Sequence, residues 1–368
     1  MVQDYPILRL RRLGRKLECE LTDPSSMQIV GIEHKFSQKT KTKINKHYES
    51  ILRMTGGEEP SLTKFKRELN KLGSEIGRTL KYILKNLAFE IKENSPIALA
   101  LDEETVKIPW ELGLLPRSLT EKNKQLFFCE AASIGRLRVV KAEYWEQTFP
   151  KKSRRDKALV VGINYEDSRH KITSLEHAEE EAEKVKAILE DNDIHVTSLQ
   201  GKEAKFNKVK EELNKGVDIF HFTGHGSTSR NKSKIYLHDK VLWAKELENL
   251  LSKSPTPSLS FFNACETAVD IEKRGKVYWA PYNWAFALAN QGGSIFIGTL
   301  WSVYELDAQA FAETFYKKFL GTRRKTLAEA MYQARNVIKR RKNGILSWPA
   351  YVLYGPPTLK PDDLFGKD

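Results

Sequence analysis

From residue 158 to the end of the chain, short apolar runs alternate with helical segments, and this alternation restricts the possible folds more than any other feature. Six runs have the length and the β-branched and aromatic content of buried strands: 158–163, 194–199, 217–222, 259–263, 294–300 and 350–354. Between them, helices are predicted for 175–190, 202–213, 244–251, 282–290, 307–320 and 327–339. Strands that alternate with helices form a mainly parallel sheet covered on both faces. The sequence therefore predicts an α/β fold for this part of the chain.

The preceding part of the chain predicts fewer strands and two long helices. The predicted strands lie within 1–32, 96–101 and 126–140, and the predicted helices are 39–54 and 61–91. Charged and aromatic residues mix with Pro150 in 141–156, which is typical of a linker. We therefore expect two domains, 1–150 and 156–368.

The formal net charge of the 368-residue chain is +13, and the positive charge is unevenly distributed. Between Lys35 and Lys92 there are fourteen Lys and Arg residues against six Glu, a surplus of eight. Such a surplus can attract nucleic acid, an anionic membrane surface or an acidic protein, but we favour the solvated face of lysine-rich helices. The sequence has no zinc-finger spacing and no RRM or KH signature, so a nucleic-acid partner has no support beyond charge.

Cysteine usage and hydropathy indicate the compartment. The cysteines are Cys19, Cys129 and Cys265, an odd and sparse set that is typical of reduced thiols rather than a disulfide framework. The first residues lack the apolar core of a secretory signal. The longest apolar runs are far shorter than the roughly 20 residues that span a bilayer. We therefore expect a cytoplasmic protein with no membrane partner.

Two of the predicted strands end in residues that are suited to nucleophilic chemistry. Residues 217–226 read VDIFHFTGHG and residues 258–267 read SLSFFNACET, so small or polar residues follow each apolar run. Reacting groups in open α/β sheets gather at the carboxyl ends of strands. His225 and Cys265 would meet at that edge, where an imidazole can activate a thiol as a nucleophile. Taken alone, Cys265 is better explained as a buried structural thiol, and His225 could equally be a structural turn residue.

Backbone groups beside these two residues fit the same chemistry. Acyl transfer needs two donors aimed at the developing oxyanion, and the N–H groups of Gly226 and Cys265 are the natural pair. The glycines around His225 let the backbone bend and approach a substrate closely. We interpret His221 as structural, because His221, His225 and Cys265 lack a fourth ligand with zinc-site spacing. No metal and no other cofactor is expected.

Taken in order, these motifs resemble the CHAT family of caspase-like cysteine peptidases, which stands beside caspases, metacaspases and separase. The segments that carry the resemblance are Ile108–Glu111 (IPWE), His225–Gly226, Asn263–Thr267 (NACET), Gly298–Val303 (GTLWSV) and Tyr351–Gly355. They cover roughly residues 96–358, and their order and spacing are more specific than any single segment. Two positions depart from related patterns, because Asn263–Glu266 stands where caspases have a QAC-type signature and Ser302 stands where a proline is usual.

The resemblance implies a caspase-like fold, a mainly parallel sheet flanked by helices, with a degenerate, regulatory half within 1–150 and the active half within 156–368. It implies peptide-bond hydrolysis in which Cys265 forms a thioacyl intermediate and His225 moves the protons. It also implies a specific protein substrate and latency until a regulatory protein binds, in prokaryotic antiviral defence or cell death.

The resemblance also suggests where the substrate side chain before the cut is recognised. The pocket is expected around Trp301, with the acidic residue of separase-like proteins corresponding to Glu305 and with Asp307 two positions further on. A carboxylate there would select Arg or Lys by charge-assisted hydrogen bonds. Either carboxylate could instead cap the following helix, and a hydrophobic preference stays open.

A loop after the nucleophile is a candidate for regulation. Residues 266–279 include Arg274, and segments in this position often rearrange or are cleaved in caspase-like enzymes. We hypothesise that the loop blocks or shapes the site until a partner binds, with self-cleavage near Arg274 as the test. An inert surface loop is the alternative.

Two other functions stay open on the sequence alone. The chain could be a caspase-like module that binds a partner without catalysis, in which case Cys265 would react with iodoacetamide no faster than the other cysteines. It could also be a nucleotide-binding α/β protein. However, Val160–Asn164 lacks the GxGxxG and Walker patterns, and a phosphate site at Gly226–Thr228 would leave Cys265 unexplained.

Overall fold

The computed structural model describes residues 4–24, 28–56, 61–121, 123–138, 156–166, 168–229, 232–266, 280–289 and 294–365. The chain divides into two compact units. Unit 1 is Met1–Trp145 with Pro356–Thr358, and unit 2 is Glu146–Gly355 with Leu359–Asp368. None of the helices in the described ranges is both long and apolar enough to cross a membrane.

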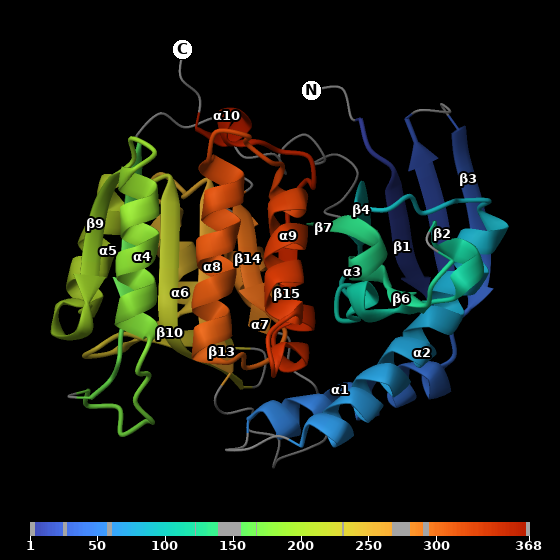
Figure 1. Cartoon of the computed structure of the whole chain (residues 1–368), viewed down its shortest axis with the longest axis horizontal. Coiled ribbons are helices and arrows are strands. Elements are labelled where there is room, and N and C mark those ends of the chain that lie inside the picture. Colours follow the sequence, from blue (N-terminus) through green and yellow to red (C-terminus); the bar gives the residue numbers. More distant parts are fainter. Residues whose placement is uncertain are drawn as a thin grey trace. The chain divides into compact units, whose positions relative to one another are not determined.

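Unit 1 is built on a mixed sheet (Figure 1). Its strands follow the order β3 (Gln28–Lys35), β2 (Lys16–Asp23), β1 (Ile7–Leu13), β4 (Ser95–Leu101) and β7 (Ala132–Arg138). The first three strands form an antiparallel meander, whereas β4 runs parallel to β1 and β7 runs parallel to β4. In β2 the buried Leu17, Cys19 and Leu21 alternate with exposed or half-buried polar residues, as expected for a strand with one face in the core. A second, two-stranded sheet pairs β5 (Leu114–Leu115) with β6 (Leu126–Phe127).

Two helices, α1 (Gln38–Thr55) and α2 (Leu62–Asn86), pack against each other in unit 1, which also contains the short α3 (Phe128–Ala131). Both long helices begin at a serine whose side chain accepts a backbone N–H bond, Ser37 for α1 and Ser61 for α2. The apolar face of α2 is buried, and its close approach to β5 requires Gly77. A Cβ there would lie 2.1 Å from the carbonyl oxygen of Leu114.

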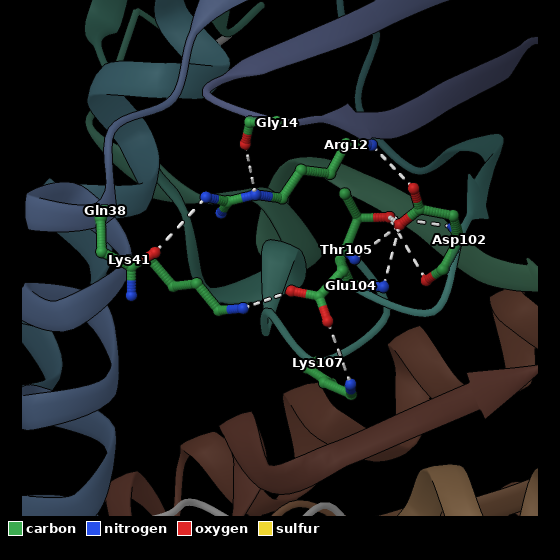
Figure 2. A network of polar contacts seen from close by, with 8 residues as sticks. All are labelled: Arg12, Gly14, Gln38, Lys41, Asp102, Glu104, Thr105 and Lys107. Carbon is green, nitrogen blue, oxygen red and sulfur yellow. Dashed lines mark hydrogen bonds and ion pairs between the residues drawn. The ribbon is translucent and has the colours of Figure 1, made fainter.

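Figure 2 shows a polar network that fixes the loop after β4. The Asp102 carboxylate accepts hydrogen bonds from the backbone N–H groups of Arg12 (2.7 Å), Glu104 (3.0 Å) and Thr105 (2.8 Å). Glu104 also forms an ion pair with Lys41 of α1. The loop therefore links β1 and α1, and it leads directly into the IPWE segment.

A buried ion pair explains the glutamate of the IPWE segment. Arg136 in β7 is 1% exposed, and its Nε and Nη2 atoms each donate to the Glu111 carboxylate at 2.5 Å. The guanidinium also donates to the carbonyls of Val106 (2.9 Å) and Ile108 (3.2 Å). A buried charge pair is tolerated when additional hydrogen bonds satisfy its polar atoms, as they do here.

Unit 2 contains the mainly parallel sheet that the sequence predicts. Its strands follow the order β9 (His195–Gln200), β8 (Lys157–Gly162), β10 (Ile219–Ser229), β13 (Leu259–Glu266), β14 (Ile295–Thr299) and β15 (Tyr351–Tyr354). Neighbours from β9 to β14 are parallel, and only β15 within this series is antiparallel to its neighbour β14. Apart from the edge strand β9, which is mostly half-buried, these strands are buried on both faces, and this is why they read as nearly continuous apolar runs.

Helices cover both faces of this sheet. They are α4 (Ala178–Glu190), α5 (Phe206–Lys215), α6 (Ala244–Leu251), α7 (Ala280–Ala289), α8 (Glu305–Leu320) and α9 (Leu327–Lys339), followed by the short α10 (Pro361–Leu364). In Figure 1, α4, α8 and α9 lie in front of the sheet and α5, α6 and α7 lie behind it. The predicted α/β class, with a mainly parallel sheet flanked by helices, is confirmed.

Two strands are longer than the sequence predicts. The predicted strands end at residues 222 and 263, whereas β10 continues to Ser229 and β13 continues to Glu266. For β10 the physical reason is β11 (Lys232–Tyr236), which pairs antiparallel with residues 226–229 and keeps the glycine-rich end of β10 in the sheet. The longer β13 then pairs with this part of β10 up to Glu266, which is the partner of Gly226. The strand β12 (Val241–Trp243) extends this hairpin. His225 therefore lies within a strand and not in a loop that follows one.

Candidate active site

The register of two neighbouring strands brings the backbones of His225 and Cys265 together. In the parallel pair of β10 and β13, His225 is the direct partner of Cys265, and Gly226 is the partner of Glu266. Neighbouring strands lie about 4.8 Å apart, so both residues occupy one short stretch of the sheet. On its other side Gly226 pairs with Ile235 of β11. The side chain of Cys265 and the loop 267–279, with Arg274, lie outside the described residues.

The imidazole of His225 is buried, and its hydrogen bonds define its tautomer. The residue is 2% exposed, and its Nε2 atom lies 2.7 Å from the carbonyl oxygen of Thr173. A carbonyl only accepts hydrogen bonds, so Nε2 carries the proton and Nδ1 of the neutral ring presents a lone pair. Nδ1 is buried and has no hydrogen-bond partner in the part of the chain that the structure describes. His225 therefore presents one unused proton acceptor.

Burial lowers the pKa of the His225 imidazole below its usual value of 6.5, and the hydrogen bond to Thr173 opposes this only in part. Burial disfavours the charged ring because an imidazolium loses its hydration when it leaves water. The neutral form with a free Nδ1 lone pair is therefore favoured at neutral pH, which is the form that a proton acceptor needs.

A His225→Gln variant tests this burial, because glutamine stays neutral at every pH. The folded-state pKa lies below the unfolded value of about 6.5, so the stabilising contribution of the neutral ring is fully present above that pH. It is lost as the pH falls through the lower folded-state pKa. Urea denaturation between pH 7.5 and 5 should therefore show wild type losing stability relative to His225→Gln. A constant difference between the two chains across this interval would contradict the prediction.

Tyr165, which the sequence analysis did not single out, contacts His225 directly. The backbone N–H of His225 donates to Tyr165 Oη at 2.8 Å, and the two rings lie 4.8 Å apart between centroids. Tyr165 Oη in turn donates to the carbonyl of Tyr236 at 2.7 Å. Its position just after the predicted strand 158–163 is the one signal that could have identified it, because that strand ends at the same edge of the sheet.

The Thr173 carbonyl belongs to the loop between β8 and α4, and two hydrogen bonds hold the end of this loop that precedes α4. Leu175 N–H donates to the carbonyl of Asn164 at 2.8 Å, and His177 N–H donates to Glu305 Oε2 at 2.8 Å. Burial raises the pKa of the Glu305 carboxyl, and its contacts with His177 oppose this. Glu305, predicted as a pocket residue, therefore contacts the loop that holds His225.

The other two predicted pocket residues lie in buried surroundings. Asp307 is 5% exposed, and its carboxylate accepts from Arg341 Nε at 2.7 Å. Burial raises the pKa of Asp307, whereas bonds from Ser347 and Arg341 act in the opposite direction. Trp301 is fully buried, and its Nε1–H donates to the carbonyl of Leu346 at 2.7 Å. The pocket role of all three residues stays a prediction.

His221 takes part in a buried network of its own. Its Nε2 lies 3.1 Å from Glu181 Oε1, and its Nδ1 lies 3.4 Å from Tyr316 Oη. Burial raises the pKa of Tyr316 far above its usual value, so this hydroxyl stays protonated and donates to His221. Asn263 Nδ2 donates to the same Glu181 oxygen at 2.7 Å. Both nitrogens of His221 are engaged, which agrees with its interpretation as a structural residue.

Metal ligation has no visible basis in the parts of the chain that are described. Across these ranges, no three His, Cys, Asp or Glu side chains gather in a way that could hold a metal ion. In this site, the described group with an unpartnered proton acceptor is the imidazole of His225, at Nδ1.

Comparison with solved structures relates this arrangement to known folds. The chain is similar to Saccharomyces cerevisiae separase in its complex with securin, with a TM-score of 0.57 and 12% identity over 96% of this chain and 30% of the separase chain. It is similar to the Arg specific cysteine proteinase gingipain R, with a TM-score of 0.54 and 13% identity over 88% of this chain and 76% of that chain. A complex of the pro- and mature domains of RgpB from Porphyromonas gingivalis gives a TM-score of 0.53 and 13% identity, over 88% of this chain and 78% of that chain. At these identities the likeness shows a shared fold, and this chain spans less than a third of the separase chain.

Comparison with curated proteins gives no match. Comparison with protein families matches the CHAT domain over residues 70–356. That range contains every segment on which the sequence analysis based its resemblance, from Ile108–Glu111 to Tyr351–Gly355. The chain therefore belongs to the CHAT domain family and has the fold of the caspase-like cysteine peptidases.

Proposed function

We propose that this chain is a cysteine endopeptidase that hydrolyses a protein substrate, with Cys265 as the nucleophile and His225 as the proton carrier. The observation that carries the proposal is the buried Nδ1 atom of His225, which has no hydrogen-bond partner among the described residues. This nitrogen belongs to the residue that pairs in register with Cys265. Membership of the CHAT family and the caspase-like fold support the same activity.

The proposed reaction begins at His225 Nδ1. This atom takes the proton of the Cys265 thiol, and the thiolate forms a bond to the scissile carbonyl carbon. The imidazolium gives that proton to the amide nitrogen as the carbon–nitrogen bond breaks, which leaves a thioester on Cys265. His225 Nδ1 then takes a proton from a water molecule as the water oxygen bonds to the thioester carbonyl carbon. The carbon–sulfur bond breaks, the proton returns to Cys265, and the product leaves with its new carboxyl terminus. The bond from Nε2 to the Thr173 carbonyl stabilises the imidazolium that forms in between.

Two backbone N–H groups are proposed to stabilise the tetrahedral intermediate. Those of Gly226 and Cys265 lie on adjoining strands, one position apart in the register. Preorganised donors of this kind account for a large share of the rate enhancement in acyl transfer.

Cleavage after a basic residue is the proposed specificity, with Glu305 as its recognition group. Asp307 is less suited to this role, because its salt bridge with Arg341 already neutralises it. The buried Trp301 would support the pocket wall from behind. Gingipain R, which shares the fold, is described as Arg specific, so Arg and Lys are the first residues to test.

Latency and regulation by a second protein form a further part of the proposal. Separase is found with securin, and RgpB is found with its pro-domain, so relatives of this fold bind protein partners. For this chain we propose a regulatory role for residues 1–150, a cytoplasmic location, and action in prokaryotic antiviral defence or cell death. These parts rest on the family resemblance and, for the location, on the odd and sparse set of cysteines.

A cut-site survey tests the activity directly. Wild-type chain and Cys265→Ala chain are incubated with a cellular proteome, with and without candidate activating proteins, and new peptide termini are sequenced. We expect termini that appear with wild type and are absent with Cys265→Ala, with Arg or Lys before the cut. A full survey without such termini, under every activating condition, would contradict the proposal.

Alkylation separates the peptidase from a caspase-like module without catalysis. An activated Cys265 should react with iodoacetamide faster than Cys19 and Cys129, both of which are buried. Burial raises the pKa of the Cys19 thiol to about 12, so Cys19 is an internal reference for an inactive thiol. Equal, slow labelling of all three cysteines, together with a negative survey, would favour the binding module.

A further inference from the structure

We infer that Tyr165 is a positioning residue for the active site, and that its hydroxyl and ring hold the His225 imidazole in the orientation that proton transfer requires. The inference rests on the proposed function, in which His225 moves the protons. Tyr165 lies in the loop that leads from β8 to α4, and it is 3% exposed. It takes no part in proton transfer or bond formation in the proposed mechanism, so its effect is exerted through His225.

Two separate contacts join Tyr165 to His225. Its Oη accepts the backbone N–H of His225 at 2.8 Å, and its ring lies against the imidazole at 4.8 Å between centroids with a 40° tilt. The same Oη donates to the carbonyl of Tyr236 at 2.7 Å, so one hydroxyl links β10 to β11. Because this hydroxyl both accepts and donates, neither of its roles can be taken over by a phenyl ring.

The backbone of Tyr165 adopts a strained conformation. Its φ is +67°, in the left-handed region that a bulky residue rarely adopts and that glycine adopts without strain. Strained residues of this kind persist where the surroundings hold them, and they cluster at active sites. The chain has a glycine where the hydroxyl needs space, since a Cβ at Gly224 would lie 2.6 Å from Tyr165 Oη.

With Tyr165 in place, His225 is fixed at three points. The hydroxyl holds the backbone N–H, the phenol ring packs against the imidazole, and the Thr173 carbonyl holds Nε2. These contacts leave Nδ1 as the one unused polar atom of the ring and restrict the directions in which its lone pair can point. A misplacement of about 1 Å at a reacting group can reduce a rate by about 10²-fold.

Steady-state kinetics of Tyr165→Phe provide the first test, on a peptide that spans a cut site from the survey. We expect kcat to fall by about 10- to 100-fold while KM stays within about twofold, because His225 loses its alignment but the substrate pocket is unchanged. Tyr165→Leu, which also removes the ring, should lower kcat further. The matched control is Tyr316→Phe, which removes a buried hydroxyl that faces His221 instead of His225 and should leave kcat unchanged. Wild-type kcat in Tyr165→Phe, or an equal loss in Tyr316→Phe, would overturn the inference.

Hydrogen exchange of the His225 backbone amide provides a second test that needs no activity. In the full chain carrying Cys265→Ala, NMR should show this amide exchanging at least about tenfold faster after Tyr165→Phe, because its acceptor is gone. Tyr316→Phe should leave that rate unchanged. If the wild-type chain cleaves no peptide, the proposed function fails, yet these exchange rates still decide whether Tyr165 holds His225. An unchanged exchange rate in Tyr165→Phe would show that it does not.

Discussion

Replacing His225 with alanine is expected to lower kcat/KM for peptide cleavage by about 10⁴-fold, or about 5.5 kcal/mol of transition-state stabilisation. The buried Nδ1 atom is the described group that can accept the thiol proton and return it to the leaving amine. Alanine removes it and leaves the thiol largely protonated at neutral pH. The measurement is steady-state kinetics of wild type and variant on a peptide taken from an identified cut site.

Two comparisons make this result specific. Because a nucleophile and its base act as a unit, the double variant His225→Ala/Cys265→Ala should be no slower than Cys265→Ala alone. His195→Ala, which changes an exposed histidine at the start of β9, should keep wild-type kinetics. A His225→Ala chain that retains a tenth or more of wild-type kcat/KM would remove His225 from the mechanism.

Much of the fold could be predicted because the hydrophobic pattern of unit 2 is strong. Its inner strands are buried on both faces, so they appear as apolar runs such as 158–163, which are typical of buried strands. The adjacency of β10 and β13 followed from the same runs, and the register then pairs His225 with Cys265. The strand ends could not be predicted, because pairing with β11 overrides the low strand propensity of the glycine-rich segment 224–229.

The residues that contact His225 could not be predicted from the sequence, for a different reason. The acceptor for Nε2 is the backbone carbonyl of Thr173. Every residue has a backbone carbonyl, so the residue type at position 173 does not predict this hydrogen bond. Tyr165 and His225 are 60 positions apart, and their contact depends on a loop whose course no periodicity describes. The hydrogen bond from His177 N–H to the Glu305 carboxylate could likewise not be predicted, because its donor is also a backbone group.

In unit 1, a buried ion pair could likewise not be predicted from the sequence. Arg136 lies in a predicted strand, where an arginine usually marks the solvent-facing side, and nothing in the IPWE segment predicts a buried partner for Glu111. The structure pairs them in the core, 25 positions apart. The physical reason that IPWE contains a glutamate is therefore a tertiary contact, and this contact leads to the second large expected effect.

Replacing Arg136 with methionine is expected to destabilise unit 1 by about 3–5 kcal/mol, and Glu111→Met should do so by a similar amount. Each change leaves the remaining charged or polar partner buried without its counter-ion, which costs far more than loss of the pair as a whole. Arg136→Met also leaves the carbonyls of Val106 and Ile108 without their donor. The measurement is urea denaturation, with hydrogen exchange of peptides from β4 and β7 to assign the transition to unit 1.

The double variant Glu111→Met/Arg136→Met separates a charge effect from a packing effect. If the unpaired charge is the main cost, the double variant should be destabilised by clearly less than the sum of the single changes, with a coupling of about 1–3 kcal/mol. Some loss should remain, because the carbonyls of Val106 and Ile108 still lack a donor. Arg9→Met, which removes a partly exposed arginine paired with Glu20 on the same sheet, is the matched control and should change stability by less than about 1 kcal/mol. Additive losses in the double variant would show that Glu111 and Arg136 stabilise unit 1 independently of one another.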